Sequence, residues 1–221
     1  MALSASFNVA SAQGYSRSTR FSEDEIGRLR ITVEGGYGYR TAKISPSVPE
    51  AFVNHTKKLR NGYFFSADAS WYPESAGFGA GLRVQNFHSF HEEKIASVGV
   101  DDDIQITYFG PQLSSRYIMG RSSLVLAITA GYLNYFNRGY DGVDYFRSGK
   151  TLGYGANFSY DFAITSRFGV GVSLSGISGT LRKMRKGDNG QSKSTQDVEL
   201  EKGDYESLAH IGASAGIRFT L

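Results

Sequence analysis

Five charged residues stand out because they lie on strand faces that are otherwise small or polar: Glu34, Asp68, Arg83, Asp161 and Arg218. Counting from the short turn between two predicted strands places Asp68 opposite Arg83, and closing the first strand on the last brings Glu34 beside Arg218. Asp161 lies about as far from the predicted turn at residues 165–167 as the other charges lie from their turns, so it is expected at a similar level in the barrel. Because an unpaired charge in an interior with little water is costly, these residues predict a salt-bridge cluster that plugs the interior. A narrow ion path gated by the same charges is the alternative.

A second group of charges lies in a predicted loop near the C-terminal end. It contains four basic residues within a run of five: Arg182, Lys183, Arg185 and Lys186. Basic side chains on an exposed loop can pair with phosphate groups or with an acidic partner. A solvated loop that keeps the rim of the fold soluble is the alternative.

Two other groups have the residue types of a metal site: His88, His91 and Glu93 in one, and the three aspartates 101–103 in the other. Histidines three apart on an extended strand point to opposite faces, so they converge on one ion only if the chain turns there. A solvated, charged loop is the favoured interpretation. Cysteine is absent, which excludes a thiolate site. We therefore predict no metal and no cofactor.

Nucleophilic catalysis would need a serine or histidine held beside an acid. His210 and Ser214 share one face of the last predicted strand but lie four residues apart, beyond hydrogen-bond reach. Glycine pairs such as Gly36 and Gly38 follow the strand period and precede no helix, so they are not phosphate-binding loops. No catalytic residue is predicted, and a non-enzymatic protein is expected.

The composition favours strands and turns. The 221 residues include 27 Gly, 14 Tyr and 15 Phe but only 4 Pro. The net charge is +3 and basic residues are interspersed with acidic ones, so the chain lacks the basic stripe that binds nucleic acid. A low mean hydropathy does not exclude a membrane, since half of each strand in a membrane barrel faces away from lipid.

Alternation at period two predicts eight strands. In the last strand, Ile211, Ile217 and Phe219 share an apolar face, whereas the opposite face is mostly glycine, serine and other small or polar residues. This pattern is typical of a strand whose apolar face meets lipid and whose small face fills a narrow lumen. The predicted strands span residues 29–42, 62–72, 78–90, 104–117, 122–137, 151–164, 168–176 and 210–221.

In the fourth predicted strand we expect Ile104, Ile106 and Tyr108 to face outward. We also expect a bulge at Gly110-Pro111, because proline cannot donate a hydrogen bond to the ladder.

The predicted connections alternate between long and short, as in barrels with short periplasmic turns and longer external loops. The long ones are 43–60, 91–103, 138–150 and 182–204. Eight strands also leave an interior that side chains just fill.

Residues 1–12 are interpreted as the remnant of a signal peptide, because Ala10-Ser11-Ala12 fits a cleavage site. Residues 13–28 are then a polar leader, and 29–221 the barrel.

On this pattern the chain resembles, from Leu29 to Leu221, the small eight-stranded outer-membrane barrels of the outer-membrane protein A and X type. The stretch from Tyr108 to Pro111 is similar to barrels of Bacteroidetes-type bacteria. Such families usually end on an aromatic residue that the assembly machinery reads, whereas this chain ends Phe219-Thr-Leu221. The resemblance implies an all-β, eight-stranded antiparallel up-and-down transmembrane β-barrel in the outer membrane of a Gram-negative bacterium.

We therefore expect a monomeric, non-catalytic barrel with a structural or surface-interaction role exerted through its long loops. Its expected partners are outer-membrane lipid and either lipopolysaccharide or an extracellular protein, and nucleic acid is not expected. The alternatives are a narrow pore, a barrel-embedded lipid-modifying enzyme and a soluble ligand-binding barrel of the lipocalin type. The outward positions from Leu152 to Ile164 carry no charge and argue against the soluble barrel.

Overall fold

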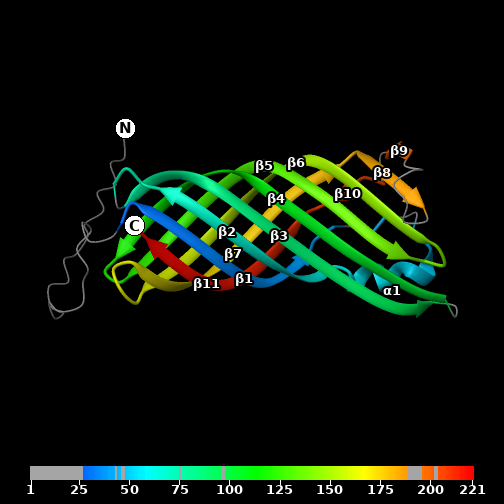
Figure 1. The fold of residues 1–221 in the computed structure, drawn as a ribbon, viewed down its shortest axis with the longest axis horizontal. Coiled ribbons are helices and arrows are strands. Elements are labelled where there is room, and N and C mark those ends of the chain that lie inside the picture. Colours follow the sequence, from blue (N-terminus) through cyan, green and yellow to red (C-terminus); the bar gives the residue numbers. More distant parts are fainter. Residues whose placement is uncertain are drawn as a thin grey trace, which may run out of the picture.

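Eight antiparallel strands close into a barrel in the computed structural model (Figure 1). The structure describes residues 27–42, 44–45, 48–74, 76–95, 98–188, 196–201 and 204–221. The predicted signal-peptide remnant, and all but the last two residues of the predicted leader, lie outside the described residues.

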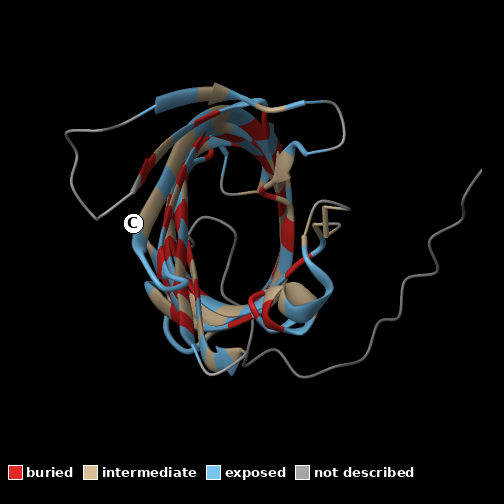
Figure 2. Cartoon of the chain, turned by 90° about the vertical axis from the view of Figure 1, so that its right-hand side faces the viewer, coloured by how far each residue is buried: buried red, intermediate tan, exposed pale blue. Residues whose placement is uncertain are grey.

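The ring consists of β1, β2, β3, β4, β5, β6, β7 and β11, and it closes where β11 pairs with both β1 and β7 (Figure 2). The start of β1, the C-terminus and the short turns lie at one end, here called the turn end, whereas α1, β8 and β9 lie at the other, the loop end (Figure 1). The elements are β1 Leu29–Arg40, α1 Glu50–Lys58, β2 Asn61–Trp71, β3 Gly77–Ile95, β4 Val98–Met119, β5 Ser122–Tyr140, β6 Asp144–Ala163, β7 Phe168–Leu181, β8 Lys183–Asp188, β9 Gln196–Glu199, β10 Glu206–Ser207 and β11 His210–Thr220.

The outer surface carries a belt of exposed apolar side chains, as the period-two pattern predicts. On β11, Ile211, Ile217 and Phe219 face outward, whereas His210 and Arg218 are buried inside. The belt continues around the ring through Val33, Phe65, Leu82, Leu113, Ile128, Leu152 and Leu174. A continuous apolar surface of this kind would be unstable in water and suits contact with lipid. No helix among the described residues is long and apolar enough to span a membrane.

The prediction of which side chains of the fourth strand face outward is wrong. Ile104, Ile106 and Tyr108 are buried inside the barrel, and Phe109 and Leu113 face outward instead. The register with β3 and β5 decides the facing, because a one-residue change moves every side chain to the other face. The inward residues join an apolar layer that fills the loop-end half of the interior: Leu59, Phe64, Phe87, Ile104, Ile106, Tyr108, Leu133, Tyr135, Ile177, Leu181, Met184 and Leu208.

Glycines make room for this layer. Gly153 and Gly179 are register partners on β6 and β7. The Leu133 side chain lies against both, so a Cβ added at either position would overlap its Cδ1. The predicted concentration of glycine on the inner face is therefore explained by the size of the side chains that face it.

The expected bulge at Gly110-Pro111 does not form. The β3–β4 register runs without a shift through Arg83↔Gly110 and Leu82↔Pro111. Toward β5 the two residues make no bridge, but the register is the same on either side of them. The proline therefore interrupts one ladder locally, and the hydroxyl of Thr129 donates a hydrogen bond to the Pro111 carbonyl at 2.8 Å.

Two of the expected long loops are strands. β3 and β4 continue to Ile95 and Val98, and β5 and β6 continue to Tyr140 and Asp144. Extending the ladder satisfies backbone groups that a loop would leave to water, so the charged residues there do not prevent pairing. The other two expected loops contain α1 and the β8–β9 hairpin, and β8 pairs with the loop-end part of β6.

The belt predicts how the barrel responds to charge on its surface. Leu113 lies midway along the belt of β4, between the exposed Tyr117 and Phe109. Leu113→Arg should lower the free energy of unfolding by about 2–4 kcal/mol, since arginine at the bilayer midplane loses its hydration. The control Gln105→Arg, on the same face of β4 but beyond the belt, should cost about 0–1 kcal/mol. Urea unfolding in lipid vesicles, followed by the fluorescence of Trp71, measures both, and equal losses would show that the belt does not meet lipid.

Candidate functional site: an ion-pair ring inside the barrel

Six charged side chains form a closed ring of ion pairs in the turn-end half of the interior, and each is at most 9% exposed. Arginines and carboxylates alternate around the ring, so its formal charge is zero. In order, the nitrogen–oxygen distances are Arg30–Asp68 3.0 Å, Asp68–Arg83 3.6 Å, Arg83–Glu34 3.2 Å, Glu34–Arg218 3.0 Å, Arg218–Asp161 2.7 Å and Asp161–Arg30 2.9 Å.

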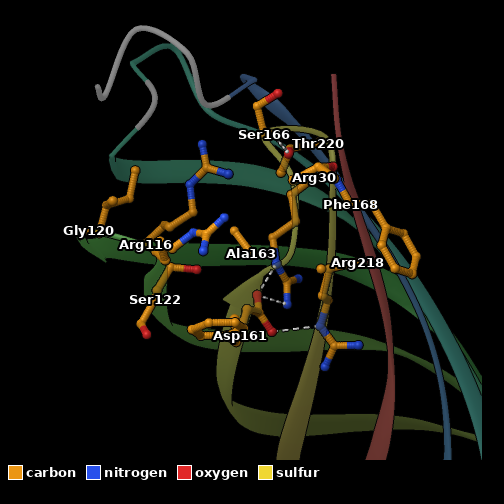
Figure 3. Close-up of a pocket in the computed structure, with 16 residues that line it drawn as sticks. Arg30, Arg116, Gly120, Ser122, Asp161, Ala163, Ser166, Phe168, Arg218 and Thr220 are labelled. Atoms are coloured by element: carbon orange, nitrogen blue, oxygen red, sulfur yellow. Dashed lines mark hydrogen bonds and ion pairs between the residues drawn. The ribbon is translucent and has the colours of Figure 1, made fainter. Parts of the chain in front are cut away.

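Strand register places these residues at one level. Asp68 and Arg83 are direct register partners on β2 and β3. Arg218 on β11 lies opposite Thr32 on β1, within reach of Glu34 on the same inner face. Asp161 reaches in from β6, and Figure 3 shows its carboxylate between the guanidinium groups of Arg30 and Arg218.

Hydroxyl groups complete the coordination of Glu34. Ser66 donates to Oε1 at 2.9 Å and Ser173 donates to Oε2 at 2.7 Å. Arg83 also donates to the side-chain carbonyl of Gln85 at 3.1 Å. Buried charges are tolerated when they are paired and hydrogen-bonded. Each member of the ring is paired with two others and makes at least one hydrogen bond, whereas Nη2 of Arg30 and Nη1 of Arg83 make ion pairs alone.

All five residues of the predicted cluster lie in this ring, which also contains Arg30. The sequence signal for Arg30 was present, because it has the same parity on β1 as Thr32 and Glu34 and so shares their inner face. Its partners Asp68 and Asp161 come from β2 and β6. The ion pair between Arg30 on β1 and Asp161 on β6 crosses the lumen. It depends on closure of the barrel and cannot be predicted from spacing along the chain.

Further side chains lie on both sides of the ring. Toward the turn end, the guanidinium of Arg116 lies 4.2 Å from the centre of the Tyr72 ring and donates a hydrogen bond to the Gly27 carbonyl at 2.9 Å. A cavity of about 50 Å³ on this side is lined by Arg116 and by Arg30, Asp161 and Arg218 of the ion-pair ring (Figure 3), and it can hold a few water molecules. Toward the loop end the apolar layer follows.

The four basic residues of the predicted binding loop do not converge. Lys183 and Arg185 lie on β8 and pair with Glu199 and Asp197 of β9 at 3.7 and 3.2 Å, with all four side chains exposed. Lys186 lies opposite Arg147 of β6. Arg182 lies 5.9 Å from the centre of the Tyr205 ring. The predicted loop is instead a strand that presents its charges along the rim.

The other sequence candidates also have defined partners. His88 and His91 point to opposite faces of β3, as their spacing predicts: His88 lies 2.6 Å from Asp103, and His91 lies 3.2 Å from Glu93. His210 accepts a hydrogen bond from Gln85 at 2.9 Å and donates to the Leu208 carbonyl at 3.0 Å, which leaves it engaged away from Ser214.

At the loop end, the pKa values of Glu93 and Tyr145 are shifted. Hydrogen bonds from Lys58 and His91 hold the pKa of Glu93 below its usual range. Burial and the negative charge of Asp102 raise the pKa of Tyr145. The Tyr145 hydroxyl therefore stays protonated and donates a hydrogen bond to Asp102 at 2.5 Å.

No protein-family model and no curated protein match the chain. Solved structures of outer-membrane proteins are similar to the chain, and the two with a TM-score of 0.50 show the fold. The outer-membrane protease OmpT from Escherichia coli is 8% identical with a TM-score of 0.50, covering 96% of this chain and 100% of its own. A major outer-membrane protein from Thermus thermophilus is 12% identical with a TM-score of 0.50, covering 86% and 99%. Neisserial surface protein A is 10% identical with a TM-score of 0.49, covering 87% and 97%.

The fold is that of the small outer-membrane β-barrels. Together with the lipid-facing belt, it places the chain in the bacterial outer membrane. The resemblance of Tyr108 to Pro111 to Bacteroidetes barrels stays a prediction.

The ring predicts a large stability cost when one of its charges is removed from the barrel. Asp161→Asn leaves Arg30 and Arg218 short of a counter-charge, and losing one partner of a buried pair costs about 3–5 kcal/mol. The control Asp144→Asn removes an exposed carboxylate from the same strand and should change stability by less than about 0.5 kcal/mol. Urea unfolding in vesicles compares the two, and an equally small effect of both would show that the ring contributes nothing to stability.

Proposed function

We propose that this outer-membrane barrel is a closed, non-catalytic scaffold whose biological role is exercised by the rim at its loop end. The observation that carries the proposal is the filled interior. The Arg116–Tyr72 contact, the ion-pair ring and the apolar layer succeed one another from the turn end to the loop end. A solute would have to displace charged groups that are paired on both sides, and then an apolar layer that cannot hydrate it.

A non-catalytic role is supported by the partners of the candidate residues. The fold alone does not decide whether the barrel is an enzyme, because the outer-membrane protease OmpT has a similar fold. His210 is held by Gln85 and Leu208, and the ring carboxylates are neutralised by arginines. Neither arrangement provides an activated nucleophile.

We propose that the partner at the rim is lipopolysaccharide, bound through its phosphate groups by β8. Lys183 and Arg185 are exposed, and their ion pairs with Glu199 and Asp197 lie in water, where such pairs contribute little and exchange readily. Arg147 of β6 adds a fifth basic residue beside Lys186. An acidic extracellular protein is the alternative partner for the same surface.

A planar bilayer tests whether the lumen is closed. We expect the inserted wild-type barrel to be electrically silent, because the ion-pair ring and the apolar layer both obstruct the path. Asp68→Ala should also be silent, since the apolar layer remains. Discrete openings whose conductance changes with Asp68→Ala or Arg218→Ala would instead show a pore gated by the ring.

Thermal unfolding tests the rim. Wild-type protein should unfold at a higher temperature in bilayers that contain lipopolysaccharide than in bilayers without it, because a ligand that binds the folded state stabilises it. Lys183→Gln with Arg185→Gln, two residues apart on the same face of β8, should remove much of this increase. The control pair Lys57→Gln with Lys94→Gln makes the same charge change on α1 and β3 and should retain it. An increase that survives the β8 substitutions would exclude β8 as the lipopolysaccharide site and favour the acidic protein partner.

A further inference from the structure

Away from the ion-pair ring, three side chains with metal-ligating atoms meet at the loop end: His55 from α1, and His91 and Glu93 from β3. Each contributes one candidate ligand atom, and these atoms lie within 4.8 Å of one another. His91 and Glu93 are two residues apart and so share one face of the strand. The rings of His55 and His91 have centroids 5.2 Å apart.

A second set of contacts fixes the orientation of His55. Its Nε2 lies 3.0 Å from Oδ2 of Asp102 on β4. Asp102 is itself held by two donors at its other oxygen, the Asn137 side-chain amide at 2.7 Å and the Tyr145 hydroxyl at 2.5 Å. A carboxylate only accepts hydrogen bonds, so Nε2 of His55 carries a proton, and in the neutral imidazole Nδ1 then presents its lone pair.

Among the residues that the structure describes, none is a hydrogen-bond partner of Nδ1. His55 is 2% exposed, and its Nδ1 is buried without a partner. The nearest carboxylate atom is Oε1 of Glu93 at 3.9 Å, which is also an acceptor. Two acceptors that face each other across this distance leave room for a bridging group between them, and a cation there would satisfy both.

We propose that His55, His91 and Glu93 bind a divalent transition-metal ion, with zinc as the best match, at the mouth of the barrel. Two imidazoles and one carboxylate are a zinc ligand set, and water would supply the fourth position. Ligand distances of about 2.0–2.1 Å place tetrahedral ligand atoms about 3.3 Å apart, so the side chains need only a small closure. The imidazoles disfavour calcium and magnesium, which prefer oxygen ligands.

Asp102 is the positioning residue of this site. A histidine that binds a metal commonly donates its other ring N–H to a carboxylate, which fixes its tautomer and raises its basicity. The chain from Tyr145 and Asn137 through Asp102 to His55 has this form.

Lys58 competes with the metal for Glu93. It lies one helical turn after His55, and its ammonium donates a hydrogen bond to Glu93 Oε2 at 2.6 Å. The Lys58 side chain is largely exposed, so it can swing into water when a metal takes its place. His91 and Glu93 are each about one-fifth exposed, which provides an entry path for the ion.

Zinc titration of the refolded full-length barrel by calorimetry tests the proposal, with zinc chloride as the only added ligand. We expect one zinc ion per chain. His91→Gln and Glu93→Gln should each weaken binding by at least the loss seen when an outer-shell partner is removed, about 10- to 100-fold. Lys58→Met should tighten binding, because it removes the competing ammonium.

His88→Gln is the matched control, since His88 lies on the same strand but pairs with Asp103 on the opposite face. It should leave zinc binding unchanged. Circular dichroism should show an intact barrel for every variant. The proposal is overturned if wild-type protein takes up no stoichiometric zinc, if His91→Gln and Glu93→Gln bind like wild type, or if His88→Gln weakens binding as much as they do. These outcomes are independent of conductance, so the zinc site and the closed scaffold can fail separately.

Discussion

Closure of the hydrogen-bonded ladder between β1 and β11 is the constraint on which the rest of the structure depends. The two strands pair from Arg30↔Thr220 to Arg40↔His210, so the sheet has no free edge in the belt. In lipid, an unpaired backbone group has no water to bond, and only helices and closed barrels satisfy every such group. Once the ring is closed, each strand must present one face to lipid and the other to a narrow interior.

The narrow interior explains the types of residue found there. Glycines on facing strands make room for large side chains such as Leu133. The charged side chains of the ion-pair ring form a neutral network, in which each of the three carboxylates contacts two arginines. Because every member of the ring contacts two others, the loss of one charge affects two partners. Stability and closure of the lumen therefore depend on the same contacts.

The loop end is built differently, since it is free of the lipid constraint. There β3 to β6 extend past the belt, and β8 takes the place of β7 beside β6. α1 brings His55 against β3 and β4, where Asp102, His91 and Glu93 surround it. The exposed ion pairs of Lys58, Lys183 and Arg185 lie in this region, as expected where a rigid scaffold presents binding groups to its surroundings.

Local spacing was enough to predict the eight strands of the ring, the lipid-facing belt and the five charges that meet inside, because alternation at period two and counting from turns use only neighbouring residues. The other features depend on contacts between elements that are distant in the chain. Tertiary structure turned Ile104 and Tyr108 inward, since register with neighbouring strands overrides the local preference of one strand. It also added Arg30 to the ring and brought His55 to His91, because both contacts join strands or helices that are distant in the chain. Such pairings arise only when the barrel closes, and no spacing within a single strand encodes them.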